Sequence, residues 1–539
     1  MSLSLLSRYA FFAACVLFSL VTLPFESHEW LWPFTLLTTV LSLVGLFDLL
    51  QTRHAVRRNY PILGNIRYLV ETIRPEIRQY LLESDSDALP FSRAQRSLVY
   101  SRAKNETADK PFGTLIDVYQ PGFEFISHSM RPAPLSDPAS FRVIVGGPQC
   151  SQPYNASIFN VSAMSFGSLS ANAIRALNKG AKLGNFAHDT GEGSISPYHR
   201  EHGGDLTWEL GSGYFGCRTR EGRFDPERFA QQALDPQVRM IEIKMSQGAK
   251  PGHGGILPKH KVTQEIADTR GIMMGEDCIS PSRHSAFNTP IELMHFIAQL
   301  RELSGGKPVG FKLCLGHPWE FMGIAKAMLE TGILPDFIVV DGAEGGTGAA
   351  PVEFTDHLGM PMREGLLFVH NTLVGLNLRD KIRLGASGKI VSAFDMASVL
   401  AIGADWCNAA RGFMFAIGCI QSQSCHTNKC PTGVATQDPL RQRALVVEDK
   451  AERVKNFHHH TLKALAEMLA AAGLEHPSQL KAKHLVRRLS ATEIKLFSQL
   501  HVFLKPGELL NGELSGEFYP RMWAMARADS FEPNEEVAA

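Results

Sequence analysis

Short apolar runs alternate with amphipathic segments of helical length along the chain from about residue 158 onward. The runs at 309–315 and 336–346 are strand-like, and the segments 319–332 and 364–378 that follow them have helical periodicity. Strands that alternate with helices of this length indicate βαβ units and a parallel sheet. The number of such units, and the glycines at the strand ends, favour a closed (β/α)8 barrel of the TIM type over an open sheet. The sequence therefore predicts an α/β fold with this barrel over residues 141–440.

Two apolar stretches without charged residues, 9–25 and 30–47, precede this body. Each has about the length that spans a bilayer core, at the short end of the range, and a brief polar turn at 26–29 separates them. Arginines flank the pair: Arg8, Arg53, Arg57 and Arg58. A cleaved signal peptide is the alternative, but no small-x-small cleavage site follows the first stretch. We expect residues 1–52 to form a transmembrane helical hairpin in the inner (cytoplasmic) membrane, with both ends and the catalytic body in the cytoplasm.

Two further segments lack the alternation of strands and helices that predicts the barrel. Residues 53–140 combine a helical stretch with polar, proline-containing sequence, which predicts a connecting helical subdomain. Residues 441–539 are charged and helical in pattern, which predicts a C-terminal helical extension.

The 54 basic and 54 acidic residues balance, so charge gives no reason to expect nucleic acid as a partner. Nine cysteines, most of them scattered, do not resemble a disulfide framework and suit a reducing compartment.

Three glycine-rich turns follow consecutive strand-like runs: Asp341–Pro351, Gly385–Lys389 and Asn408–Gly412. Glycines there let backbone N–H groups approach a phosphate, and Arg411 adds a charge-assisted donor. The second turn precedes a helix that begins with a capping-box pattern at Ser392 and Asp395. Tight barrel turns alone would need no such repetition, so the three turns favour a phosphate-bearing cofactor. Neither a P-loop nor a Rossmann fingerprint is present in the sequence.

A basic, glycine-rich loop follows the strand-like run at 238–243. It contains Lys244, Lys250, Lys259 and Lys261, and Arg270 lies a short helix later. This much positive charge among residues of fixed geometry indicates an ordered loop that binds an anion, although a solvated basic loop has the same composition. Lys312 lies inside the apolar strand 309–315, and a lysine that points into a barrel needs a partner. In flavin-binding barrels, a cation beside the ring stabilises the reduced anion.

Three cysteines lie close together at a C-x5-C-x4-C spacing: Cys419, Cys425 and Cys430. Zinc prefers four ligands, commonly in C-x2-C pairs, and His426 could complete a Cys3His set. The observed spacing suits zinc poorly and suits an iron–sulfur cluster better, and Pro431 gives the run the Cys-Pro ending of ferredoxin-type motifs. On spacing alone, an iron–sulfur cluster is the first interpretation, with zinc and unligated thiols as alternatives.

Several motifs together resemble one known family. Segments 244–262, 342–351 and 418–439 read KMSQGAKPGHGGILPKHKV, GAEGGTGAAP and GCIQSQSCHTNKCPTGVATQDP. In this order they closely resemble the FMN-binding synthase domain of glutamate synthase, in its large-subunit and ferredoxin-dependent forms. The segments AMSFGSLS at 163–170 and HDTGEGS at 188–194 are similar to the same domain.

The resemblance implies a role for each candidate residue. In the family the three cysteines hold a [3Fe-4S] cluster, which implies Cys419, Cys425 and Cys430 as its ligands. The contacts to 2-oxoglutarate map onto Lys244, Gln247, Lys250 and Arg270, and a glutamate near the ammonia entry maps onto Glu192. FMN is expected to contact Met164, Ser165 and Lys312, with its phosphate near Gly346, Thr347, Gly388 and Arg411. The implied reaction reduces 2-iminoglutarate, formed from 2-oxoglutarate and ammonia, to L-glutamate.

The chain also departs from the family. We expect no N-terminal glutaminase and no C-terminal β-helix, because too few residues flank the barrel. Within the basic loop, His253 replaces a glutamate and Ile256 replaces a substrate-contacting glutamine, which favours a different 2-oxo or imino acid as an alternative. A membrane-tethered electron-transfer module without turnover is a further alternative. The expected partners are the membrane and an electron donor, a ferredoxin or a reductase subunit, with a homo-oligomer as another option.

Overall fold

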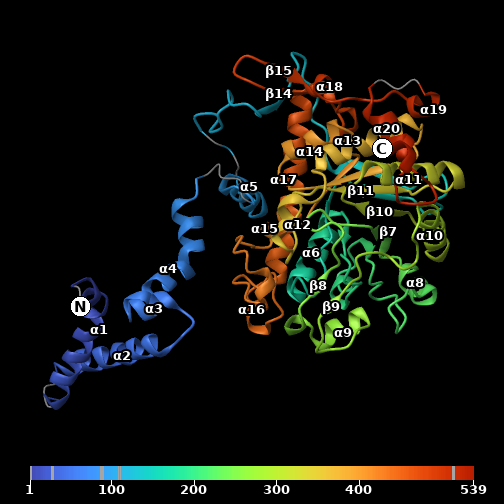
Figure 1. Cartoon of the computed structure of the whole chain (residues 1–539). Helices are drawn as coiled ribbons and strands as arrows, with labels where there is room; N and C mark the ends of the chain where they lie inside the picture. Colours follow the sequence, from blue (N-terminus) through green and yellow to red (C-terminus); the bar gives the residue numbers. More distant parts are fainter. Residues whose placement is uncertain are drawn as a thin grey trace. The chain divides into compact units, whose positions relative to one another are not determined.

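The computed structural model describes residues 3–25, 30–84, 90–106, 109, 111–512 and 516–538 (Figure 1). The chain divides into two compact units, residues 1–87 and residues 88–539, and each is described by itself.

In the first unit, helices α1 (Leu3–Thr22) and α2 (Trp32–Leu50) pack against each other. Hydroxyl groups join them, since Ser19 donates to Thr38 and Thr35 donates to Thr22, both at 2.9 Å between oxygens. Of the described helices, α2 is the one that is long and apolar enough to cross a membrane, and the apolar part of α1 is shorter. The predicted turn at 26–29 lies outside the described residues.

Three short elements complete the first unit: α3 (Ala55–Asn59), α4 (Leu63–Ile77) and the π-helical turn Arg78–Leu82. The buried carboxylate of Asp48, near the end of α2, accepts hydrogen bonds from the backbone N–H of Ile62 and from the amide of Asn65. Asp48 therefore fixes the start of α4 to the end of α2.

The second unit contains the predicted barrel. Eight parallel strands close in the order β10-β11-β12-β13-β4-β5-β6-β7, which confirms the (β/α)8 prediction. The strands are β4 (Phe159–Val161), β5 (His188–Asp189), β6 (Leu206–Leu210), β7 (Val238–Lys244), β10 (Val309–Leu313), β11 (Phe337–Asp341), β12 (Arg383–Ser387) and β13 (Trp406–Ala409). The pairing of β13 with β4 closes the cylinder. Most strand residues are buried, as expected for parallel strands that are covered by helices.

Helices surround the barrel (Figure 1). They include α6 (Ala171–Gly184), α8 (Pro226–Ala233), α10 (Pro290–Leu303), α11 (Pro318–Thr331), α13 (Met362–Gly375), α14 (Ala393–Ala401) and α15 (Arg411–Ala416). Shorter helices in the loops are α7 (Pro197–Arg200), α9 (Gln264–Arg270), α12 (Val352–His357) and α16 (Pro439–Arg443). The capping box predicted at Ser392 and Asp395 is present at the start of α14, which confirms that prediction.

The C-terminal part of the chain packs onto the barrel layer. Helix α17 (Val447–Ala471) lies against α6, α14 and α5 (Arg93–Ala103). Strand β14 (Leu485–Arg488) pairs with β15 (Ile494–Leu496) and with β1 (Glu124–Ile126), so a strand from before the barrel joins a sheet formed after it. Remaining elements are strands β2 (Arg142–Val145), β3 (Tyr154–Ser157), β8 (Ile256–Leu257) and β9 (Cys278–Ile279), and helices α18 (Phe497–Leu500), α19 (Glu508–Asn511), α20 (Phe518–Met525) and α21 (Glu535–Ala538). The extension is therefore mostly helical but contributes one small antiparallel sheet.

Candidate active site

A cavity of about 370 Å³ opens at the C-terminal ends of the barrel strands. In barrels of this type, the loops at this end form the active site. The structure brings every residue predicted for the site into the lining of this one cavity: Met164, Ser165, Glu192, Lys244, Gln247, Lys250, Arg270, Lys312, Gly346, Thr347, Gly388, Arg411, Cys419, Cys425 and Cys430. Residues from distant parts of the sequence meet here because parallel strands end at the same rim.

One side of the cavity is strongly cationic. Lys244, the last residue of β7, places its Nζ 3.1 Å from Oε2 of Glu192 and 2.8 Å from Oε1 of Gln247. Lys250 and Arg270 are only 5% and 4% exposed. Burial lowers the pKa of Lys250, and the charge of Glu192 partly offsets that shift. The cations are therefore held largely out of water, where an anion would be attracted most strongly.

Arg270 lies at the end of α9 and is held by its two terminal nitrogens. Nη2 donates to the carbonyl of Phe166 at 2.9 Å, and Nη1 lies 3.4 Å from Sγ of Cys278. Its Nε–H is buried and finds no partner among the described residues. A buried donor without a partner is costly, so this group is suited to an incoming acceptor.

Glu192 is the single carboxylate among these cations. Burial alone would raise its pKa, but Lys244, Arg270 and Lys250 outweigh burial and lower it. The hydroxyl of Ser280 lies 3.4 Å from Oε2 of Glu192. Glu192 is therefore ionised, and three cations around one anion leave an excess of two positive charges.

Lys312 projects from β10 into a group of acidic residues inside the barrel. Its Nζ forms an ion pair with Glu209 and lies 3.2 Å from Oε1 of Glu242. Asp189, Glu209 and Glu242 each have a carboxylate oxygen within 4.8 Å of the others. Burial alone would lower the pKa of Lys312, but these carboxylates raise it well above its usual value. Lys312 thus has the partners that its position in an apolar strand requires.

The three acidic partners are candidate site residues that the sequence analysis missed. Glu209 lies in the strand LTWEL, Glu242 in VRMIEIK, and Asp189 in the HDTGEGS segment. A charged residue inside an apolar strand was the available signal, as it was for Lys312.

Close backbone approaches surround Arg411 at the opposite side of the cavity. Arg411 donates from Nη2 to the carbonyl of Glu344 at 3.0 Å. A Cβ at Gly346 would lie 2.7 Å from Cζ of Arg411, and one at Gly388 would lie 3.0 Å from Oε1 of Glu344. A side chain at either position would therefore crowd Arg411 or Glu344, and the turns leave their backbone bare beside a buried guanidinium. This donor set fits a phosphate group.

The cysteine loop follows α15 and forms the third part of the lining. Burial alone would raise the pKa of Cys430, but hydrogen bonds from the backbone of Ala435, Thr432 and Val434 and from the hydroxyl of Thr432 lower it. Burial raises the pKa of Cys425, and that of Cys419 to about 12. Backbone donors aimed at a buried sulfur fit a thiolate that ligates a metal centre.

Spacing distinguishes the candidate metal centres. Among the described residues, only Asp189, Glu209 and Glu242 offer three ligand atoms within 4.8 Å of one another. The three cysteines do not meet that spacing, which one tetrahedral zinc ion would require of its ligands.

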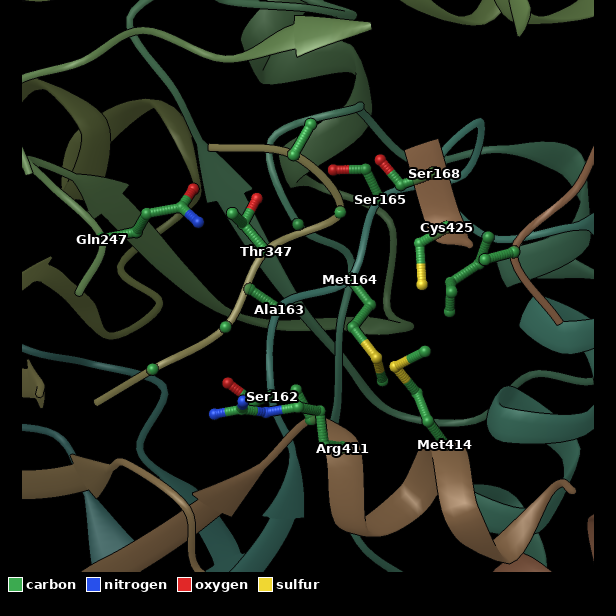
Figure 2. Close-up of a pocket in the computed structure, with 18 of the residues that line it drawn as sticks. Ser162, Ala163, Met164, Ser165, Ser168, Gln247, Thr347, Arg411, Met414 and Cys425 are labelled. Carbon is green, nitrogen blue, oxygen red and sulfur yellow. The ribbon is translucent and has the colours of Figure 1, made fainter. Parts of the chain in front are cut away.

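Methionines lie between the phosphate-binding turns and the cysteine loop. Figure 2 shows the side chains of Met164 and Met414 extending into the pocket, between those of Arg411 and Cys425 in this view. Met164 follows β4 and Met414 lies on α15. The interior between the two parts is therefore apolar and polarisable.

The two unusual residues of the basic loop differ in position. Ile256 lines the cavity and is 46% exposed. Nδ1 of His253 donates a hydrogen bond to the carbonyl of Gly254 at 2.7 Å, and its ring packs edge-on against Phe354. Of the two substitutions, only Ile256 changes the described lining of the cavity.

The fold and the site together define a TIM-type barrel with a cationic candidate active-site cavity at its rim. Residues 148–475 match the family described as "Conserved region in glutamate synthase". The chain is 37% identical over 495 residues to the "Glutamate synthase large subunit-like protein YerD" of Bacillus subtilis, which covers 84% of this chain and 94% of that protein. This chain belongs to the glutamate synthase family.

More distant relatives match a smaller share of the chain. The "Archaeal-type glutamate synthase [NADPH]" of Thermotoga maritima is 33% identical over 339 residues, which is 62% of this chain and 64% of that protein. Among solved structures, a flavocytochrome b2 variant with benzoylformate aligns with a TM-score of 0.41 at 12% identity, over 84% of this chain and 92% of that one.

Proposed function

We propose that this chain is an FMN- and iron–sulfur-dependent oxidoreductase that reduces 2-iminoglutarate, formed from 2-oxoglutarate and ammonia, to L-glutamate. The observation that carries the proposal is the charge of the cavity, where Lys244, Lys250 and Arg270 surround Glu192. The excess of two positive charges matches the two carboxylates of 2-oxoglutarate. Membership in the glutamate synthase family supports the same reaction.

Arg270 and Lys250 are assigned to the substrate carboxylates. Both side chains are buried, so a carboxylate bound there interacts with them in a low dielectric. The Nε–H of Arg270 would gain the acceptor that it lacks among the described residues. Gln247, held by Lys244, would direct its amide toward the 2-oxo group.

Glu192 is assigned to the nitrogen substrate. Its carboxylate is kept ionised by the neighbouring cations, and an ionised carboxylate accepts hydrogen bonds from ammonium. Condensation of ammonia with the 2-oxo group releases water, and reduction of the resulting imine consumes two electrons and two protons. Lys244, whose Nζ lies 3.1 Å from Oε2 of Glu192, is the residue that would hold a proton beside this nitrogen.

The residues around Arg411 and Lys312 fit FMN. Gly346, Thr347 and Gly388 would hold the phosphate with Arg411, while Met164 and Ser165 would line the ring site. Lys312, kept charged by its acidic partners, would face the ring. Cys419, Cys425 and Cys430 would hold a [3Fe-4S] cluster. When bound, FMN supplies the electron pair for the reduction, and the cluster supplies electrons to FMN.

Anaerobic turnover of the purified protein tests the proposal. The protein is reduced chemically, 2-oxoglutarate and ammonium are added, and flavin absorbance and glutamate are measured. We expect reoxidation that needs both substrates and yields one glutamate for each flavin oxidised. A flavin that stays reduced with both substrates present contradicts the proposal and would favour an electron-transfer module without its own turnover.

Ile256 favours a second candidate, an FMN oxidoreductase that acts on another 2-oxo or imino acid. Its apolar side chain lines the cavity at a place where the family resemblance implies a glutamine. A site that hydrogen-bonds a substrate group discriminates more strongly than an apolar one. A panel of 2-oxo acids in the same assay separates the candidates, because a less polar acid should then reoxidise the flavin faster than 2-oxoglutarate. Ile256→Gln should shift the preference back toward 2-oxoglutarate.

We also propose that α1 and α2 anchor the protein in the inner membrane, with the barrel in the cytoplasm. The length and composition of α2 and the arginines that follow it support this placement. A ferredoxin or a reductase subunit would supply electrons from the same compartment. The protein should remain in the membrane fraction after carbonate extraction, and release by carbonate would contradict an integral anchor.

A further inference from the structure

Part of the cavity wall comes from residues 90–103, which lie before the family-matched region 148–475. We call residues 90–103 the N-terminal strap. Pro90 and Phe91 line the cavity, and helix α5 (Arg93–Ala103) continues from them. A capping box between Ser92 and Gln95 fixes the point at which the strap turns from the cavity wall into the helix.

The strap contacts the proposed phosphate ligand. Cζ of Arg411 lies 4.7 Å from the ring centroid of Phe91, which is 1% exposed. Burial lowers the pKa of Arg411 to about 10, so the charged guanidinium costs free energy in the folded protein. A cation–π contact in a desolvated site recovers part of that cost. The ring of Phe91 also packs edge-on against Phe415 of α15, at 5.3 Å between centroids.

The strap also contacts the cysteine loop. The side-chain amide of Gln421 donates to the carbonyl of Phe91 at 3.2 Å, and the hydroxyl of Tyr100 donates to the carbonyl of Cys419 at 2.7 Å. Phe91 thus contacts residues of both proposed cofactor sites, and Tyr100 contacts the cysteine loop.

We propose that the N-terminal strap positions both redox sites: Phe91 holds Arg411 against the flavin phosphate, and Tyr100 holds the Cys419 end of the cluster loop. This proposal rests on the proposed FMN and cluster sites. Both are positioning residues, because each contacts a residue that is proposed to hold a cofactor.

Phe91→Ala tests the first half of the proposal. We expect FMN to bind about tenfold more weakly, as for loss of a buried cation–π contact, while iron content stays unchanged. Phe91→Tyr keeps a ring over Arg411 and should bind FMN as the unmodified protein does. Equal FMN affinity for Phe91→Ala and the unmodified protein overturns the assignment, as does equal weakening by Phe91→Tyr.

Tyr100→Phe tests the second half, because it keeps the ring and removes the hydroxyl that donates to the carbonyl of Cys419. Iron content and cluster absorbance are followed during incubation with an iron chelator, and FMN is measured on the same samples. We expect Tyr100→Phe to lose its cluster several-fold faster than the unmodified protein while FMN stays bound. Equal rates of cluster loss in the two proteins overturn the role of Tyr100. If the unmodified protein itself contains neither FMN nor iron, the proposed function fails first; if it contains both and no variant differs from it, only the strap proposal fails.

A separate observation concerns the surface of α4 in the first unit. Apolar side chains recur at helical spacing along it and are exposed: Leu63, Ile66, Leu69, Val70 and Ile73. Arg67, Arg74 and Arg78 fall along one edge of this stripe, at matching helical positions. An exposed apolar stripe bordered by arginines is the pattern of a helix that lies in a membrane interface.

We infer that this face of α4 binds an anionic lipid surface. The arginines complement negative headgroups, and the helix starts soon after the apolar α2 ends at Leu50. Benzoylphenylalanine in place of Ile73 should crosslink to lipid when the full chain is reconstituted in vesicles that contain phosphatidylglycerol. The same group in place of Thr72, away from the stripe, should crosslink several-fold less. Crosslinks from position 73 to protein, or equal lipid crosslinks from both positions, overturn this inference.

Discussion

At the scale of single residues, the site depends on charges that are buried and only partly compensated. Lys250 and Arg270 lie almost entirely out of water, and Glu192 is the carboxylate that faces them both. Such an arrangement is unfavourable without an anion and becomes favourable when one binds. The contribution of each cation should therefore appear in substrate binding more than in folding.

Lys250→Ala should weaken the binding of 2-oxoglutarate by about 10- to 100-fold, the range expected for one charge-assisted hydrogen bond. FMN binding should not change, because Lys250 belongs to the basic loop and is not one of the residues proposed to hold FMN. Lys259→Ala removes an exposed lysine of the same loop and is the matched control. Titration of flavin absorbance with 2-oxoglutarate measures both effects, and equal affinity in Lys250→Ala would remove this residue from the substrate site.

The acidic group inside the barrel predicts a dependence of stability on pH. Burial, together with Glu209, raises the pKa of Glu242 from 4.5 to about 7, although Lys312 opposes the shift. The folded state thus keeps a proton that the unfolded chain releases, so the free energy of unfolding should fall as pH rises from about 4.5 through 7. Thermal unfolding between pH 5 and pH 8 measures the slope, and Glu242→Gln should reduce it. A slope that is unchanged in this variant would show that other groups hold the proton.

At the scale of elements, the rim of the barrel was the most predictable part of the site. The rim can be located in the sequence because each strand-like run is followed by a glycine-rich turn or by lysines. The residues that would bind ligands therefore lie within the same short segments that predict the strand ends. The acidic partners of Lys312 and the ring of Phe91 were missed, since each acts through contacts between segments far apart in the sequence. Arg411 and Phe91 are 320 positions apart, and no local sequence pattern at either position predicts their contact.

Gly346→Ala should lower FMN occupancy in the purified protein several-fold, because a Cβ there would lie 2.7 Å from Cζ of Arg411 and displace the guanidinium. Gly316→Ala is the control, since a Cβ at that position meets nothing within 4 Å. Flavin released per protein is the measurement. Full occupancy in Gly346→Ala would show that Arg411 can move without loss of the cofactor.

Cys425→Ser should remove the iron and the visible absorbance of the cluster while FMN remains bound. Cys150→Ser, at a half-buried cysteine outside the loop, should retain both. Iron analysis and flavin absorbance are measured on the same samples. Unchanged iron in Cys425→Ser would refute the ligand assignment.

At the scale of the whole molecule, the chain has two units with different surfaces. Residues 1–87 expose many large apolar side chains along α1 and α2, whereas the unit from residue 88 onward buries a continuous core that includes the barrel. The apolar stretches near the N-terminus and the alternation of strands and helices after residue 158 predict this difference between the two units from the sequence. The small sheet that joins β1 to β14 was not expected, because its strands are three and four residues long and lie 361 positions apart.

Deletion of residues 1–52 should give a flavin-loaded protein that no longer needs detergent, because the second unit retains its core and its cavity. The shortened protein should still bind anionic vesicles through α4 and leave them at high salt. Deletion of residues 1–103 also removes the strap and should lose flavin. Equal flavin content after both deletions would contradict a role for the strap, and an insoluble 53–539 protein would show that the hairpin supports folding of the body.

The strap has a consequence for how enzymes of this family can be recombined. Sequence similarity to the family's conserved region begins at residue 148, yet Phe91 lines the cavity and Tyr100 contacts the cysteine loop from before that boundary. A chimera that exchanges only residues 148–475 would join the barrel of one protein to the strap of another, and Arg411 and Cys419 would then meet foreign partners. With the strap acting as proposed, the transferable module begins at residue 90, and grafts made at that junction should keep their cofactors where grafts made at residue 148 lose them.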